Sequence, residues 1–249
     1  MTNPDAELHA RRAASFGAQA AAYAEHRPDY PDAAIGWVLG KGTENVLDLA
    51  AGTGKLTQSL LARGLRVTAV EPDAEMLAEL SKRFPEAEAM TGTAEDIPLP
   101  AGSVDAVLVG QAFHWFDVAK ALDEIGRVLR PGGMLGAFWN YENPDVPWVA
   151  RYEELVRTGV SRTTSQGPLP DGHPLFGPFE RDTFDHSFRR TAESLAATVA
   201  THSHMLVASE ADRTAALTRL LTYLKAQPET ANGEFDLPLR TIAVKTRRR

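Results

Sequence analysis

The sequence predicts an α/β fold in which helices cover both faces of a mostly parallel sheet. Two observations carry this prediction. Short apolar runs alternate with helix-length amphipathic segments through the first two-thirds of the chain, as expected when a crossover helix follows each strand. The first of these runs also leads directly into a small-residue turn and a helix start, an arrangement that suits close approach of a ligand.

Five strands and the helices between them follow from this alternation. The strands are predicted at Asn45–Leu49, Arg66–Val70, Glu88–Met90, Val104–Val109 and Leu135–Trp139. The apolar spacing predicts helices at Leu56–Arg63, Ala74–Phe84 and Ala119–Leu129. Arg130-Pro131-Gly132-Gly133 should end the last of these helices and form a turn.

Further helices and strands are predicted toward both ends of the chain. An alanine-rich helix at Ala13–Glu25 should stop before Pro28 and Pro31, and a second helix is expected at Asp32–Leu39. Thr158–Phe179 is rich in Gly, Pro, Ser and Thr and predicts a surface insertion or lid. The tail predicts a strand at Thr183–Phe188, one or two helices within Ser194–Ala226, and a last strand at Leu237–Lys245. We expect one domain, with a helical cover (1–40), a core (41–140), and a lid with C-terminal strands (141–249).

The composition of the chain excludes several kinds of site and several classes of protein. The 249 residues include no cysteine, which excludes disulfides, zinc thiolate sites, iron–sulfur clusters and a cysteine nucleophile. The start of the chain has no apolar signal region, and no run approaches the roughly 18 apolar residues of a membrane span. The net charge of −7 argues against a nonspecific nucleic-acid binder. We therefore expect a cytoplasmic protein, monomeric or homodimeric, whose basic end Lys245–Arg249 is a solvated tail.

The segment Val46–Thr57 is a buried strand, a small-residue turn and a helix start. Glycine allows positive φ and close approach of a ligand to the backbone. Roughly 20 residues later, at the end of the second strand, Glu71 could accept hydrogen bonds from both hydroxyls of a ribose. The third glycine of the dinucleotide fingerprint is absent, because Thr57 stands there. A P-loop is also excluded, because Leu56 follows Gly54-Lys55 and Leu49 stands where the first glycine would be.

On these residues the chain resembles the class I S-adenosylmethionine-dependent methyltransferases, in particular the small-molecule branch with ubiquinone-type and trans-aconitate-type enzymes. The resemblance implies a Rossmann-like, seven-stranded sheet whose last strand is antiparallel. It implies that Asp48, Ala50, Gly52 and Gly54 hold the methionine part of the cofactor. It also implies that Glu71, followed by Pro72, holds the ribose and that Met76 lies against the adenine. Many relatives have glycine at position 50, and alanine there should be tolerable if its φ is negative.

Two further segments extend the resemblance. Thr91–Pro100 is similar to the family's adenine loop, where Thr93, Ala94 and Glu95 would contact the purine. Thr93 stands where an acid is common, so the exocyclic amine contact is expected to pass to Glu95, to Asp96 or to a water. Gln111-Ala-Phe-His-Trp-Phe116 follows the fourth strand and resembles a segment beside the sulfonium, which implies that Gln111 and Phe113 contact the cofactor.

The N-terminal segment resembles a helix that closes over the cofactor in the same branch. Tyr23 and Arg27 are one helical turn apart and could reach one spot together. Arg27 could pair with the cofactor carboxylate, or it could bond only local carbonyl groups.

The chemistry expected at this site is in-line methyl transfer to a small-molecule acceptor, on oxygen or nitrogen rather than on carbon, for which alignment supplies most of the catalysis. His114 is a candidate base or a positioning residue. Trp115, Phe116, Trp139 and Tyr141 could line a pocket or pack in the core. No metal site is expected, since His202 and His204 have no evident carboxylate partner. An RNA or protein methyltransferase and a non-catalytic cofactor-binding module remain as alternatives.

Overall fold

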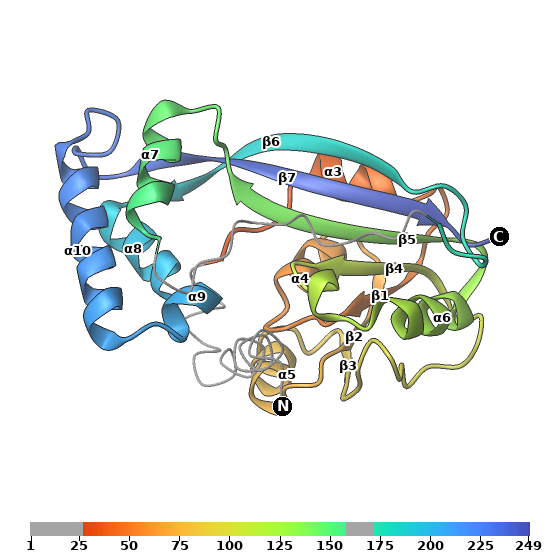
Figure 1. Cartoon of the computed structure of the whole chain (residues 1–249). Helices are drawn as coiled ribbons and strands as arrows, with labels where there is room; N and C mark the ends of the chain where they lie inside the picture. The colour runs from red at the N-terminus through yellow and green to blue at the C-terminus, as the bar shows by residue number, and fades with distance from the viewer. Residues whose placement is uncertain (1–26, 158–171) are drawn as a thin grey trace. The chain divides into compact units, whose positions relative to one another are not determined.

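The computed structural model covers the whole chain, and it describes residues 27–157 and 172–249 (Figure 1). The predicted helix Ala13–Glu25 and Tyr23 therefore lie outside the described residues. The strands are β1 (Asn45–Leu49), β2 (Arg66–Val70), β3 (Glu88–Met90), β4 (Val104–Gly110), β5 (Leu129–Glu142), β6 (Glu180–Arg190) and β7 (Phe235–Arg247). The helices are α3 (Asp32–Val38), α4 (Lys55–Leu61), α5 (Ala74–Arg83), the 3₁₀ turn η2 (Phe113–Trp115), α6 (Val118–Val128), α7 (Pro147–Leu155), α8 (Ala192–Ala200), α9 (Ser203–Leu206) and α10 (Glu210–Ala226).

The predicted fold class is confirmed. All seven strands form one sheet in the order β3-β2-β1-β4-β5-β7-β6, with β1 to β5 parallel and the last strands antiparallel. β1 pairs with β2 on one side and with β4 on the other, so the connections after β1 and β4 leave in opposite directions. In parallel sheets such a switch point opens a crevice at the carboxyl ends of the strands. The fold therefore places a ligand site beyond Leu49 and Gly110.

The central strands are predicted well because burial on both faces requires apolar residues almost without interruption. Val46, Leu47 and Leu49 of β1 are fully buried, and so are Ala106, Val107, Leu108 and Val109 of β4. The first three strands have the predicted bounds, and β4 is one residue longer.

β5 differs from its prediction because it begins at Leu129, so Arg130–Gly133 belongs to the strand. The strand begins earlier because it pairs with residues at the C-terminal end of the chain. The amide of Gly132 donates to the carbonyl of Arg248, and the amide of Arg248 donates to the carbonyl of Gly133. The predicted solvated tail is therefore wrong, since β7 runs to Arg247 and the following residue is paired.

Of the predicted insertion Thr158–Phe179, residues 158–171 lie outside the described part of the chain. Its last part, residues 172–179, is a surface loop that one buried side chain anchors. Phe176 is fully buried, and the amide of Gly177 donates to the carbonyl of Arg247. This part of the segment is attached to the end of β7, and the lid stays a prediction.

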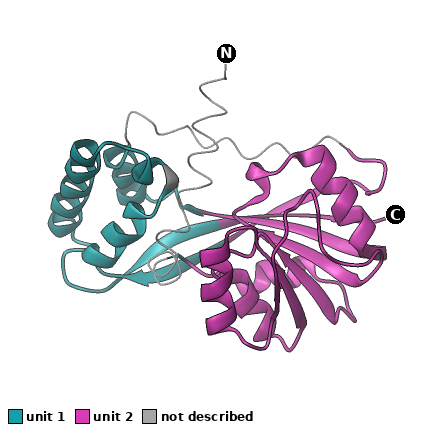
Figure 2. Cartoon of the chain, turned by 90° about the horizontal axis from the view of Figure 1, so that it is seen from below, with its two compact units in different colours: residues 1–27, 141–165, 185–240 teal, residues 28–140, 166–184, 241–249 magenta. Residues whose placement is uncertain are grey.

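The chain divides into two compact units (Figure 2). Unit 2 comprises residues 28–140, 166–184 and 241–249, and unit 1 comprises residues 1–27, 141–165 and 185–240. In unit 2, α3 and α4 pack on one face of the sheet through Ile35, Leu56 and Leu60 against Leu108 and Phe138. The prediction of a single domain is not tested by this division and stays a prediction.

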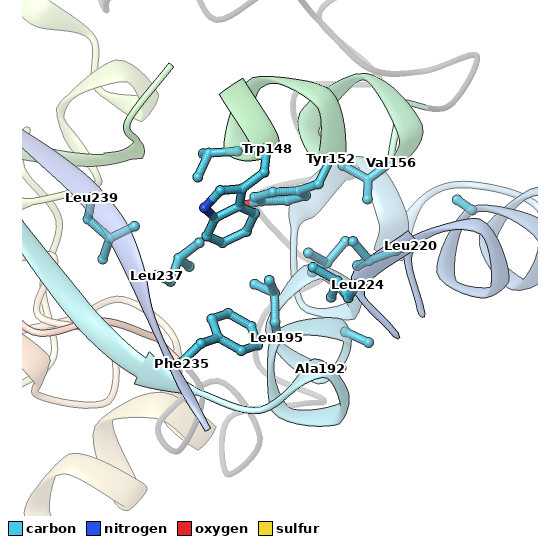
Figure 3. Close-up of a cluster of buried hydrophobic side chains, with 14 of the residues drawn as sticks. Trp148, Tyr152, Val156, Ala192, Leu195, Leu220, Leu224, Phe235, Leu237 and Leu239 are labelled. Carbon is cyan, nitrogen blue, oxygen red and sulfur yellow. The ribbon is translucent and has the colours of Figure 1, made fainter. Parts of the chain in front are cut away.

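Unit 1 has an apolar core of its own, in which side chains of α7, α8, α10 and β7 point toward one another (Figure 3). Trp148 packs edge-on against Phe235, with ring centroids 5.7 Å apart. The predicted helical region is confirmed as helical, although it consists of three helices, with His202 just before α9 and His204 within it. In the part of the chain that the structure describes, no helix has the length and apolar character needed to cross a membrane.

Candidate functional site

The turn after β1 forms the centre of the candidate site, and its backbone is unusual. Ala50, Gly52 and Gly54 all have positive φ, at 56°, 56° and 87°. The condition of a negative φ, under which alanine at position 50 would be tolerated without strain, is not met. A Cβ in this region crowds the backbone, which costs about 1–2 kcal/mol, so the turn holds strain at Ala50.

Gly52 and Gly54 have different neighbours. A Cβ on Gly54 would lie 2.7 Å from the ring of Phe84, at the end of α5, so close packing requires glycine there. A Cβ on Gly52 would find Met76 Sδ at 3.8 Å, an ordinary contact distance. Gly54 thus lets α4 and α5 pack together. Gly52 allows the left-handed backbone of the turn, and it faces Met76.

Asp48 is a buried acid on β1, directly before this turn, with 1% of its surface exposed. Its Oδ2 accepts a hydrogen bond of 2.6 Å from Thr57 Oγ1 on α4. Its Oδ1 and the buried Thr53 Oγ1 have no hydrogen-bond partner among the residues that the structure describes. Burial raises the pKa of Asp48 to about 7, although the bonds from Thr57 oppose this shift.

Glu71 joins the turns that follow β1 and β2. Its Oε2 accepts from the amide of Gly52 and its Oε1 from the amide of Asp73, each at 2.9 Å. Burial raises the pKa of Glu71, and the two amide bonds counteract the rise. A carboxylate has about four acceptor positions, so each oxygen retains one for a ligand hydroxyl.

The start of α5 closes this side of the site. Asp73 caps the helix by accepting from the amides of Glu75 and Met76, each at 3.0 Å. The cap places Met76, which is 6% exposed, beside Gly52, and its contact with the adenine stays a prediction. Pro72 is exposed between Glu71 and Asp73.

The predicted adenine loop is held in place by α6. Thr93 and Asp96 form a short antiparallel bridge, and Ala94 between them is buried. Glu95 Oε1 accepts from the amide of Asp117, just before α6, at 2.8 Å. On α6 itself, Arg127 donates to the carbonyls of Ile97 and Leu99. One oxygen of Glu95 is thus committed to the protein, which leaves the other for the expected purine contact.

The segment after β4 lies at the other side of the switch point. Gln111 has a φ of 58°, rare for a residue with a side chain, and its Nε2 donates to the carbonyl of Asn140 at 2.9 Å. Phe113 is buried, and its ring packs near those of Phe116 and Trp139, at centroid distances of 5.4 and 6.4 Å. His114 is exposed, with its ring 4.7 Å from that of Trp115.

Arg27 belongs to unit 1, where its Nη2 donates to the carbonyl of Thr201 at 3.1 Å. Thr201 is 174 residues from Arg27 in the sequence, so its carbonyl is not one of the local carbonyl groups considered for Arg27. The pairing of Arg27 with the cofactor carboxylate stays a prediction. In the described ranges, no group of His, Asp or Glu side chains is arranged to hold a metal ion.

The comparisons with known proteins agree on one family. A methyltransferase domain model matches residues 47–137. A methyltransferase of Mycobacterium tuberculosis, named as uncharacterized, is 41% identical over 232 residues, which cover 93% of this chain and 94% of that protein. The chain belongs to the class I S-adenosylmethionine-dependent methyltransferases.

Two more distant proteins are also similar to this chain. A demethylmenaquinone methyltransferase of Clavibacter sepedonicus is 34% identical to this methyltransferase over 47% of the chain and 49% of its own length. A candidate type II methyltransferase of Anaeromyxobacter dehalogenans, 23% identical, shares the fold with a TM-score of 0.64 over 89% of this chain and 97% of its own.

The residues of this methyltransferase fit an S-adenosylmethionine molecule at the switch point. Asp48 Oδ1 and Thr53 Oγ1 are buried polar atoms without a partner in the described ranges, and such atoms are uncommon unless a ligand or water completes them. Glu71 keeps acceptor positions for hydroxyl groups, and Met76 supplies an apolar wall.

Sequence reasoning missed two residues of this arrangement. In the sequence, Thr57 indicates only that the third fingerprint glycine is absent, whereas in the structure its hydroxyl donates to Asp48. Asn140 is the last residue of the predicted core, yet it accepts from Gln111 and Thr241 and donates to the carbonyl of Asp29. The position of Thr57, in the first turn of α4 and close after an acidic strand residue, could have indicated the contact with Asp48.

Proposed function

We propose that this methyltransferase transfers a methyl group from S-adenosylmethionine to the oxygen or nitrogen of a small-molecule acceptor. The observation that carries the proposal is the pair of buried acids, Asp48 and Glu71, on either side of a left-handed turn at the switch point of the sheet. This pair offers acceptor oxygens to the amino acid and ribose parts of the cofactor.

The chain's residues would bind and orient the cofactor, whose sulfonium supplies an activated methyl group when bound. Asp48 and the turn through Gly54 would hold the methionine part, Glu71 the ribose, and Met76 with Thr93 to Glu95 the adenine. Gln111 and Phe113 would form the wall next to the methyl group. Holding donor and acceptor in line supplies several kcal/mol, so no nucleophile on the protein is needed.

His114 is the residue that we propose for the acceptor side. It lies in η2, between Phe113 and Trp115, and is exposed. A histidine at this position could take a proton from a hydroxyl or ammonium group, or it could only orient the acceptor. Replacing His114 with Gln separates these roles, because loss of a base changes the pH profile of the rate, whereas loss of orientation lowers the rate at every pH.

A small molecule is favoured as acceptor because the net charge of −7 disfavours an RNA substrate. The relative named demethylmenaquinone methyltransferase also carries the name of a small-molecule acceptor, over the half of this chain that it matches. We further propose that the protein acts without nucleic acid or membrane, as a cytoplasmic monomer or homodimer.

The test combines binding and turnover. Calorimetry should show S-adenosylmethionine and S-adenosylhomocysteine binding and no binding of NAD. Incubation with a panel of small hydroxy, amino and carboxylic acids should then produce S-adenosylhomocysteine. Methylation of bulk RNA or protein alone would contradict the small-molecule assignment. Cofactor binding without turnover on any panel would favour a non-catalytic module.

Glu71→Ala tests the proposed contact of Glu71 with the ribose. It removes the acceptors for the ribose, so we expect cofactor binding to weaken by about 2–3 kcal/mol. The amides of Gly52 and Asp73 also lose their partner, so the free energy of unfolding should fall by about 1–3 kcal/mol. Unchanged cofactor affinity in a folded variant would show that Glu71 only joins the two turns.

A further inference from the structure

Tyr152 of α7 carries a hydroxyl group that is buried in unit 1. Its side chain points into the apolar core of this unit, where its ring centroid lies 6.3 Å from that of Trp148 and only 1% of the residue is exposed (Figure 3). Among the residues that the structure describes, none forms a hydrogen bond with the Tyr152 hydroxyl. Nearly all buried hydroxyl groups have such a partner, so an orphaned one indicates a missing ligand or water.

Two acidic side chains lie at this hydroxyl. Glu142 is the last residue of β5, and Glu153 follows Tyr152 on α7. The hydroxyl faces Glu142, since burial and then the charge of Glu142 raise the pKa of Tyr152. The carboxyl groups of Glu142 and Glu153 are within hydrogen-bonding reach of each other. Both glutamates are partly exposed, so a ligand in solution can reach the pair.

Bonds from other elements of unit 1 fix the two segments that carry these acids. Directly after Glu142, the amide of Asn143 donates to the carbonyl of Pro238 on β7 at 3.0 Å. On α7, the carbonyl of Trp148 accepts from the hydroxyl of Tyr223 on α10 at 3.1 Å. The two carboxyl groups and the hydroxyl are thus held together without a ligand, which reduces the ordering cost of binding one.

The cations of α7 do not neutralise the pair. Arg151 is bonded to Glu154 at 2.6 Å. Burial and the charge of Glu142 raise the pKa of Glu153 to about 7, and the charge of Arg157, just after α7, opposes this rise only in part. In the described ranges, no Lys, Arg or His side chain forms an ion pair with Glu142 or Glu153. Two adjacent acids without a paired cation favour a ligand that brings positive charge.

We infer that Glu142, Glu153 and the hydroxyl of Tyr152 form a binding site in unit 1 for the ammonium group of a small amine. An ammonium group has three N–H donors, and two carboxyl groups with one hydroxyl oxygen can accept all three. A metal ion fits less well, because Mg²⁺ and Ca²⁺ take about six or more oxygen ligands, and the described residues offer no cluster of three or more acidic or histidine side chains. The site uses none of the residues proposed to hold the cofactor, so this inference goes beyond the proposed function and does not depend on it.

Titration with three related compounds tests the site. Benzylamine, benzyl alcohol and benzoate each carry one benzene ring and differ in the charge of the head group. The full chain is titrated with each at pH 8, without cofactor, and the backbone amide signals are followed by NMR. We expect benzylamine to shift the signals of residues 142–143 and 150–157 and to bind at least about tenfold more tightly than benzyl alcohol, and we expect no binding of benzoate. Equal affinity for the amine and the alcohol, shifts confined to other residues, or tighter binding of Mg²⁺ at these amides would overturn the inference.

Four variants show whether these side chains hold the amine. Glu142→Gln and Glu153→Gln each remove one charge with little change of shape, so each should weaken benzylamine binding about tenfold. Tyr152→Phe keeps the ring in the core and should weaken binding about three- to tenfold. Glu154→Gln is the matched control, because it removes a charge one residue farther along the exposed side of the same helix, and it should change the affinity less than about twofold. If Glu154→Gln weakens binding as much as Glu153→Gln does, α7 attracts amines only through its general charge, and the site is wrong.

Discussion

Asp48 shows at the scale of one residue how a binding site reduces the stability of its own fold. Its carboxyl is fully buried, and its pKa is raised to about 7 by that burial. In the unfolded chain the same group has its ordinary pKa near 3.9. The folded state therefore holds the proton more tightly, so the contribution of Asp48 to stability is present at low pH and is lost as the pH rises through about 7.

The stability of the Asp48→Asn variant should therefore increase relative to that of the parent protein as the pH rises. We expect the difference in free energy of unfolding between variant and parent to shift toward the variant by about 2–3 kcal/mol from pH 5 to pH 8. Urea unfolding at both pH values measures this difference without ligand. A constant difference would show that Asp48 titrates normally.

Ala50 is a strained residue that the sequence did not indicate. The backbone angle of a turn depends on its neighbours, and alanine in place of glycine gave no reason to expect a φ of 56°. Ala50→Gly should relieve about 1–2 kcal/mol of strain and lose about 0.5–1 kcal/mol through the freer unfolded chain. We expect a net gain of about 0.5–1 kcal/mol in urea unfolding. A less stable glycine variant would mean that the turn holds no strain there.

At the scale of elements, the bounds of strands with purely local signals were predicted, whereas strand ends that depend on distant partners were not. β1 and β2 are apolar and buried, so their bounds follow from composition. The start of β5 reads as a turn, because its pairing with Arg248 comes from the other end of the chain. The resemblance identified Asp48 and Glu71 as site residues, but their bonds to Thr57 and to the amides of the turns are three-dimensional facts.

The packing of α4 on α5 provides a prediction at this scale. Gly54→Ala and Gly64→Ala both place a Cβ at positive φ, but only the first meets a neighbour, the ring of Phe84 at 2.7 Å. Gly64 has open space around it and is the matched control. We expect Gly54→Ala to lose about 1–3 kcal/mol more stability than Gly64→Ala, and to lose cofactor affinity, which the control retains. Equal losses in thermal unfolding would show that φ alone requires glycine at position 54.

For the whole molecule, the end of the chain contributes to the sheet of unit 2 instead of serving solubility. Arg248 exchanges backbone bonds with Gly132 and Gly133, and the amide of Arg249 donates to the carbonyl of Leu175. The guanidinium groups add bonds of their own, since Arg247 donates to the carbonyl of Gly132 and Arg249 to that of Pro174. Every one of these acceptors is a neutral carbonyl, so the contribution of the tail should depend on backbone pairing more than on charge.

Two variants separate pairing from charge. Removing residues 247–249 deletes several backbone bonds worth about 0.5–1.5 kcal/mol each, so we expect the free energy of unfolding to fall by about 2–4 kcal/mol. Changing the same three arginines to glutamine keeps the backbone bonds and should cost less than half as much, with little dependence on salt. If the tail is only solvated, neither variant should change the free energy of unfolding in urea. If the tail acts through its charge, the glutamine variant should be as unstable as the truncated chain. Backbone pairing alone predicts a large loss for the truncation together with a small one for the substitution, because only the truncation leaves Gly132 and Gly133 at an unpaired strand end.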